Sequence, residues 1–233
     1  MMNSPYANPD QLGVRPSVQL STAFLTQAFT WMFIALLVTT GVGTLLWTLP
    51  QESLQSLSGI WIFILIGQLV LAFTLTLAIK RISATVALLL FFVYAASMGI
   101  TLGLILWTYE LGSILTAGVS AASIFAGAAI YGAVTKRNLA SLGGYLFMGL
   151  IGLLVAMVVN IFVGWETLNF IISVVGVLIF TGLTAFDVQR IQRGQLAAFT
   201  ESMEKGAVMG AFVLYLDFVN LFLMLLRLFG NQR

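Results

Sequence analysis

The chain has 233 residues, of which 60% are hydrophobic and 8% charged, and its mean hydropathy is +1.05. A soluble domain carries about 25% charged residues, so this composition predicts an integral membrane protein. The absence of cysteine excludes disulfides and sulfur-ligated metals. The absence of histidine removes the usual zinc ligand and the side chain that most often changes its charge near neutral pH. A net charge of +2 is too small for a basic nucleic-acid-binding face, so the expected partner is the lipid bilayer and not nucleic acid.

Residues 1–20 are polar and lack the basic and apolar regions of a cleaved signal peptide, which predicts a disordered cytosolic tail before one membrane domain at 21–233. Seven apolar runs follow, each near the ~20 residues that a spanning helix needs. We expect membrane helices at 28–49, 60–79, 84–108, 113–134, 142–164, 168–190 and 206–229. The connection from Gln189 to Lys205 is expected to be helical in part. Because no run alternates with period two, the predicted fold is an all-α, seven-helix transmembrane bundle and not a barrel.

Basic residues predict the orientation of the bundle. Lysine and arginine lie before the first helix and after the second, fourth and sixth helices, whereas the other connections carry Glu52, Glu110 and Glu166. By the positive-inside rule, this alternation places the N-terminus in the cytosol. Arg227 and Arg233 break the rule if the last helix spans fully, so a re-entrant last segment is an alternative.

Two carboxylates, Asp187 and Asp217, stand inside the last two apolar runs. Asp217 lies roughly 16 Å along its helix from Gly206, near the middle of a ~30 Å hydrocarbon core, where an ionised carboxylate costs at least ~2.5 kcal/mol. Asp187 lies closer to the cytosolic end, and this difference in depth argues against contact unless the last helix is lowered or tilted. If the two meet, they would share one proton and act as a pH sensor, bridging two helices when protonated and repelling when deprotonated. The alternative is two separate carboxylates, each bonded to polar neighbours.

Other polar residues have simpler interpretations. Lys80, Arg81 and Glu110 lie at helix ends, where their side chains can reach the membrane interface. Small-residue pairs, at 99 with 103 and at 206 with 210, predict close helix packing within one bundle rather than a dimer face. The remaining polar residues either line a hydrated cavity or, as we expect, form hydrogen bonds between helices; they are Asn160, Thr181, Thr184, Tyr215 and Asn220.

The segments GLTAFDVQRI and LYLDFVNLFLMLLRLFG around the two aspartates, with IYGAVTKRNL at 130–139, resemble the Bax inhibitor-1 (transmembrane Bax inhibitor motif) family, in particular its bacterial inner-membrane members. The resemblance covers nearly the whole chain after residue 20. It implies a bundle whose last helix is surrounded by the other six. It also implies a pH-sensitive calcium leak with Asp187 and Asp217 as paired sensor, and a basic residue, Lys80 or Arg81, that latches these aspartates. We expect no cofactor beyond transient calcium. Gln68 stands where some members have an acidic residue, which removes one candidate cation ligand and leaves Gln68 as a candidate polar residue of the pore or its surroundings.

Three functions compete on these observations. The first is a pH-gated cation (calcium) leak channel. The second is a membrane interaction protein that modulates a membrane protease or a stress response without conducting ions. The third, an intramembrane aspartyl protease, also needs two aspartates on adjacent helices, but that class carries Gly-x-Gly-Asp, and here Leu214, Tyr215 and Leu216 precede Asp217. We therefore expect no enzyme, no catalytic residue and no firmly bound metal.

Overall fold

The computed structural model describes residues 18–50 and 59–231 of the chain, and the regular elements in this part are helices. Seven of them are long and apolar enough to cross a membrane, and α8 is a short connecting helix. The all-α, seven-helix prediction is therefore confirmed. The helices are α1 (Val18–Leu46), α3 (Trp61–Ala78), α4 (Ala84–Leu106), α5 (Leu111–Val134), α6 (Ala140–Val163), α7 (Glu166–Gln192), α8 (Gln195–Thr200) and α9 (Met203–Phe229).

Each predicted membrane helix coincides with an observed one, and most ends differ by a few residues. The exception is α1, which begins at Val18 rather than at residue 28, so residues 18–20 of the predicted tail are helical. The rest of that tail, Glu52 and Arg233 lie outside the described residues. Helix α8 confirms the expected helical part of the connection before the last membrane helix.

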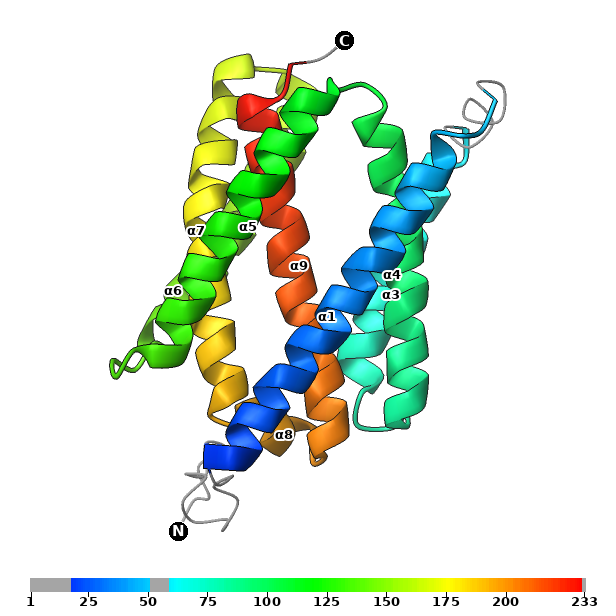
Figure 1. Ribbon diagram of the computed structural model, residues 1–233. Coiled ribbons are helices and arrows are strands. Elements are labelled where there is room, and N and C mark those ends of the chain that lie inside the picture. Colours follow the sequence, from blue (N-terminus) through cyan, green and yellow to red (C-terminus); the bar gives the residue numbers. More distant parts are fainter. Residues whose placement is uncertain (1–17, 51–58, 232–233) are drawn as a thin grey trace.

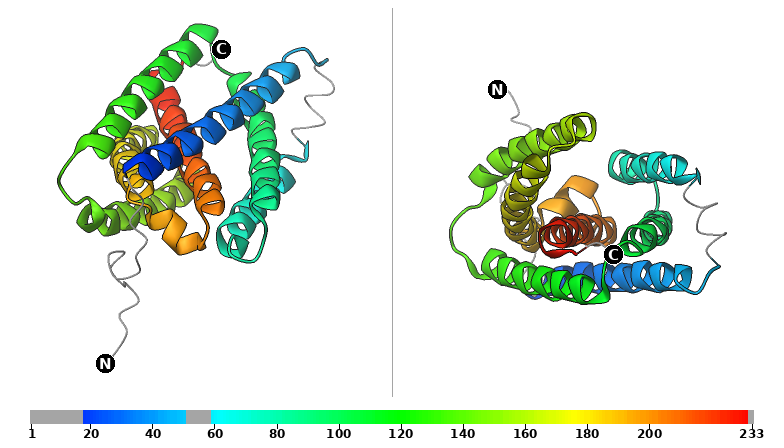
Figure 2. Two further views of the ribbon diagram at one scale, coloured as in Figure 1. Left: turned by 60° about the horizontal axis from the view of Figure 1, so that its bottom comes forward. Right: turned by 90° about the horizontal axis from the view of Figure 1, so that it is seen from above.

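Helix α9 runs through the centre of the bundle. Seen along the bundle axis, α1 and α5 lie on one side, α3 and α4 on another, and α6 and α7 on a third, with α9 between them (Figure 2). In α9, 72% of an 18-residue apolar window is buried, against 11% in the corresponding windows of α3 and α6. The central position of the last helix is thus confirmed. Helix α9 is continuous over 27 residues and ends at the end of the bundle away from the start of α1 (Figure 1). This course favours a full span over the re-entrant alternative.

Small residues allow the closest helix approaches. A Cβ atom on Gly99 of α4 would lie 2.7 Å from the carbonyl oxygen of Thr39 in α1. A Cβ atom on Gly206 of α9 would lie 2.8 Å from the Cα atom of Ala197 in α8. The second glycine of each pair makes a similar approach, to α1 and to α7 respectively. Both small-residue pairs therefore serve packing within the bundle, as predicted.

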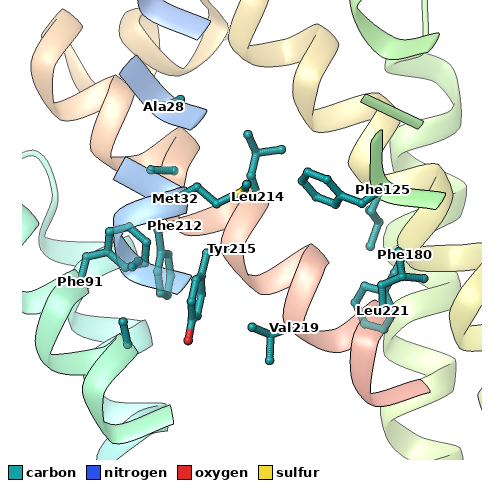
Figure 3. Packing of buried hydrophobic residues seen from close by; sticks show 14 of the residues in the cluster. Ala28, Met32, Phe91, Phe125, Phe180, Phe212, Leu214, Tyr215, Val219 and Leu221 are labelled. Atoms are coloured by element: carbon teal, nitrogen blue, oxygen red, sulfur yellow. The ribbon is translucent and has the colours of Figure 1, made fainter. Parts of the chain in front are cut away.

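Aromatic side chains join α4 to α9, as Figure 3 shows. The ring of Phe212 packs edge-on against Phe91 and Tyr94, with centroid distances of 5.6 and 5.2 Å. The ring of Tyr215 lies 5.4 Å from that of Phe91, and its hydroxyl is 2.7 Å from the hydroxyl of Thr39 in α1. These contacts fix α1, α4 and α9 against one another.

Candidate functional site

Asp217 stands near the middle of α9, and only 4% of its surface is exposed. Its Oδ2 atom is buried and has no hydrogen-bond partner among the described residues. Four of the helices packed against α9, namely α1, α4, α5 and α8, contain no charged residue. Any charge that faces Asp217 from a neighbouring helix must therefore come from α7.

Asp187 is buried near the end of α7, with 5% of its surface exposed. Arg190 lies one helical turn further on, and its Nη1 atom is 3.8 Å from Oδ1 of Asp187. Helices α7 and α9 pack along each other, and the carboxyls of Asp187 and Asp217 are close enough for their charges to interact. Direct contact between the two carboxyls, against which the difference in depth argued, stays a prediction.

The sequence patterns did not reveal Arg190 as a partner of Asp187. Basic residues near helix ends were used to predict orientation, and this residue was grouped with them. Residues three apart on a helix lie on the same face, so the spacing from Asp187 to Arg190 was the available signal. The arginine side chain is 34% exposed, so it reaches from the buried carboxylate to the surface. Asp187 consequently has a nearby counter-charge, whereas Asp217 forms no ion pair with any of the described residues.

Lys80 lies in a different cluster, at the end of the bundle where α8 is found. Its Nζ atom is 3.4 Å from Oε1 of Glu201 and 4.9 Å from the centre of the Phe199 ring. Lys205 donates a hydrogen bond of 3.1 Å to the carbonyl oxygen of Lys80. These contacts tie the α3–α4 connection to α8 and to the start of α9. Within the described part of the chain, neither Lys80 nor its neighbour Arg81 forms an ion pair with an aspartate.

Three of the other polar candidates form hydrogen bonds to side chains of a neighbouring helix. The Tyr215 hydroxyl reaches α1, as described above, which agrees with the prediction. Asn160 of α6 donates a bond of 2.7 Å to Asn169 of α7, also as predicted, but at the end of α7 opposite Asp187. Gln68 of α3 donates a bond of 2.8 Å to the hydroxyl of Thr101 in α4. These residues hold helices together in separate places and do not gather around the two aspartates.

For three other residues the expectation of bonds between helices is wrong. Thr181, Thr184 and Asn220 each donate to a carbonyl four residues earlier in their own helix. The physical reason is that this carbonyl is the acceptor nearest to a polar side chain that sits inside a helix.

Among the described residues there is also no group of three acidic, histidine or cysteine side chains that could hold a metal ion.

Two further residues near the end of α7 hold the α5–α6 connection. Gln189 accepts a hydrogen bond from the backbone N–H of Leu139 and donates one to the carbonyl oxygen of Arg137, both at 2.9 Å. Arg193 donates a bond of 2.7 Å to Oδ1 of Asn138. A displacement of this end of α7 would therefore carry the α5–α6 connection with it.

A cavity of about 520 Å³ borders α9 beyond Asp217, toward the end of the bundle away from α8. Its walls are formed by α1, α4, α5 and α9, and almost all lining side chains are apolar. From α9 the lining includes Phe218, Val219 and Phe222. The central helix thus passes from a densely packed region, through Asp217, into a region beside an open space.

Comparison with known proteins finds relatives along most of the chain. The model of the protein family described as "Inhibitor of apoptosis-promoting Bax1" matches residues 21–233. The chain is 38% identical over 228 residues to the inner membrane protein YbhL of Escherichia coli. The matched region covers 94% of this chain and 96% of that protein. An uncharacterized protein of Deinococcus radiodurans is 37% identical over 90% of both chains. An uncharacterized protein of Borreliella burgdorferi is also 37% identical, over 94% of this chain and 96% of its own length.

Proposed function

The chain belongs to the Bax inhibitor-1 family, and we propose that it is a pH-sensitive cation (calcium) leak channel gated by Asp187 and Asp217. The observation that carries this proposal is the pair of buried carboxylates on α7 and α9; one oxygen of Asp217 has no hydrogen-bond partner in the described part of the chain. Calcium as the permeating ion follows from the family resemblance. By similarity to YbhL, an inner membrane protein, we propose a bacterial inner membrane with the N-terminus in the cytosol.

The gate would work through charge repulsion between the two helices. Two carboxylates in a low-dielectric interior cannot both ionise cheaply, so at lower pH a shared proton holds α7 and α9 together. When the pH rises and this proton leaves, Asp187 and Asp217 repel each other, and Arg190 partly compensates the charge of Asp187. The repulsion would displace α9 from α7 and open a path beside the central helix. Cation flux is therefore proposed to increase with pH.

The other predicted site residues would take supporting roles. The family resemblance implies a basic latch on the aspartates at Lys80 or Arg81, whereas the contact that Lys80 makes joins α3 to α8 through Glu201. Gln68, Asn160 and Tyr215 would maintain the packing of the helices that surround or adjoin α9. Calcium would pass as cargo, with no resident cofactor and no catalytic step.

Calcium flux into dye-loaded liposomes tests the proposal. The full chain, Asp187→Asn and Asp217→Asn are compared between about pH 6 and pH 8. We expect flux through the unmodified protein to rise with pH, and both variants to lose this dependence because a neutral amide cannot repel a carboxylate. Glu166→Gln is the matched control, since Glu166 is an exposed carboxylate at the other end of α7 and should leave the profile unchanged.

Two results would contradict the proposal in different ways. A pH profile that neither asparagine variant alters would reject the paired gate, and absence of flux from every sample would reject the channel. In the second case the interaction-protein hypothesis would remain. Crosslinking in native membranes that recovers a membrane protease would then support it.

A further inference from the structure

The cavity beside α9 opens toward the membrane. Its volume of about 520 Å³ lies within the range of ~300–1,000 Å³ that is usual for ligand sites. The walls come from membrane-spanning helices, and on α5 the lining residues Leu111, Leu115 and Val119 are 50%, 60% and 67% exposed. The exposed face of a spanning helix contacts lipid, so the surrounding medium at this opening is hydrocarbon rather than water.

The lining offers little to a polar ligand. Its polar groups are three threonine hydroxyls and the indole of Trp47. The Thr39 hydroxyl already bonds to the carbonyl oxygen of Ala95 at 2.9 Å and to the Tyr215 hydroxyl at 2.7 Å. The Thr44 hydroxyl bonds to carbonyls of its own helix. Because an unpaired polar group in such surroundings costs ~2–7 kcal/mol, the occupant must be apolar along most of its length.

The space persists because no side chain fills it. A Cβ atom on Gly118 of α5 would have no atom within 4 Å, and Phe218 and Phe222 of α9 are only partly buried along the opposite wall. Atoms that line an empty apolar space lose their dispersion contacts on that side. In a bilayer, the groups available to restore those contacts are the hydrocarbon chains that surround the opening.

The rim of the cavity favours an amphipathic lipid over a free hydrocarbon. Trp47 follows the last residue of α1 and is 37% exposed. Tryptophan at the end of a membrane helix is typical of the headgroup level, where its ring has an apolar body and one polar N–H. A lipid headgroup can therefore lie beside this residue while its chain extends into the cavity.

We propose that the cavity binds one acyl chain of a phospholipid from the leaflet at the end of the bundle where α9 terminates. The chain would pass between α1 and α5, which flank α9 on the same side (Figure 1), and would rest on Phe218 and Phe222. In this position it shields the part of α9 that follows Asp217 from water. The proposed lipid site does not depend on ion conduction, so the proposal holds whether or not the protein is a channel.

Photo-crosslinking in proteoliposomes tests this site. The full chain is reconstituted into vesicles of phosphatidylglycerol and phosphatidylethanolamine that contain a small fraction of phosphatidylethanolamine with a diazirine near the end of one acyl chain. Illumination followed by peptide mass spectrometry should place adducts on the cavity-lining residues of α5 and α9. These adducts should saturate as the labelled fraction increases, whereas labelling of the outer lipid-facing surface should rise in proportion.

Two glycines of α5 provide a matched pair of variants. Gly118→Phe places a ring in the cavity and should abolish the saturable adducts. Gly127→Phe adds the same ring on the same helix outside the cavity, again where a Cβ atom meets nothing within 4 Å, and should retain them. Gly118→Leu gives the same test with a smaller side chain if the phenylalanine variant does not elute as a folded protein in gel filtration. Adducts that do not saturate, that lie only outside the cavity, or that survive both Gly118 substitutions would overturn the proposal and indicate surface lipid only.

Discussion

The two halves of the central helix differ in how they are held. From Gly206 to Phe212 every residue of α9 is buried, and small residues in this half let α7, α8 and α1 approach closely. From Phe218 onward, buried residues alternate with partly buried and exposed ones, and the helix borders a cavity of about 520 Å³. Asp217 lies between these two halves. A helix that is clamped at one end and bordered by a lipid-filled space at the other can tilt about the clamped end, and a charge at the boundary is well placed to drive that tilt.

The largest expected difference between the halves concerns two phenylalanines. Phe212→Ala should lower the free energy of unfolding by up to ~3–5 kcal/mol, because the lost ring leaves a void in a fully packed region. Phe222→Ala should cost clearly less, since its ring lines a cavity that lipid or detergent chains can enter. Unfolding in mixed micelles, followed by circular dichroism, measures both values. Equal costs would show that the two halves of α9 are packed alike.

Substitution of two glycines compares the packing around the same two halves of α9, because each substitution adds atoms instead of removing them. Gly206→Val should destabilise the protein by ~1–3 kcal/mol, because its Cβ atom would lie 2.8 Å from backbone atoms of Ala197. Gly118→Val should be nearly neutral, since a Cβ atom there meets nothing within 4 Å. The same unfolding assay serves for both variants. A costly Gly118→Val would mean that the space beside Gly118 is closed in the folded protein.

Arg190 tests the charges at the boundary between the halves. Arg190→Gln removes the counter-charge of Asp187 and makes ionisation of the aspartate pair harder. The midpoint of the flux–pH profile should therefore move to higher pH, by up to about one pH unit, or about 1.4 kcal/mol. Arg193→Gln is the control, because Arg193 donates to Asn138 rather than to an aspartate. A shift of the same size in both variants would assign the effect to general surface charge.

The smallest expected effect belongs to the hydrogen bond just before the boundary. Tyr215→Phe removes the bond of 2.7 Å to the Thr39 hydroxyl while keeping the ring in its aromatic contacts. Hydrogen bonds between membrane helices contribute about 0.6 kcal/mol on average, and a loss of that size is expected in the unfolding assay. Thr39→Val and the double variant complete a cycle that isolates this bond. A coupling near zero would show that the aromatic contacts alone hold α9 to α1.

The helices and their close approaches were predictable because their signals are local. Apolar length determines a spanning helix, and glycines four residues apart on one face determine where another helix can approach. The central position of α9 was predictable through the family resemblance, which rests on the motifs around Asp187 and Asp217. Gln68 and the two aspartates were likewise recognised by their place in motifs.

The contacts that connect distant parts of the chain were not predictable from these patterns. Lys80 was one of two candidates for a latch on the aspartates, but its partner in the structure is Glu201, which is 121 residues away in the connection between α7 and α9. The cavity depends on the absence of a side chain at Gly118 and on the courses of four helices, neither of which has a sequence motif. The polar residues that bond to their own helix were missed because a single sequence does not show which acceptor is nearer.

The distance between α7 and α9 as a function of pH tests the central claim most directly. The chain contains no cysteine, so spin labels can be attached at Phe170→Cys on α7 and Phe229→Cys on α9 without removing native thiols. Both sites are exposed and lie at the end of the bundle away from α8. Between about pH 6 and pH 8 in lipid bilayers, the label separation should lengthen in the protein with both aspartates and stay constant with Asp217→Asn. A separation that does not change with pH, or that changes equally in both proteins, would contradict the account.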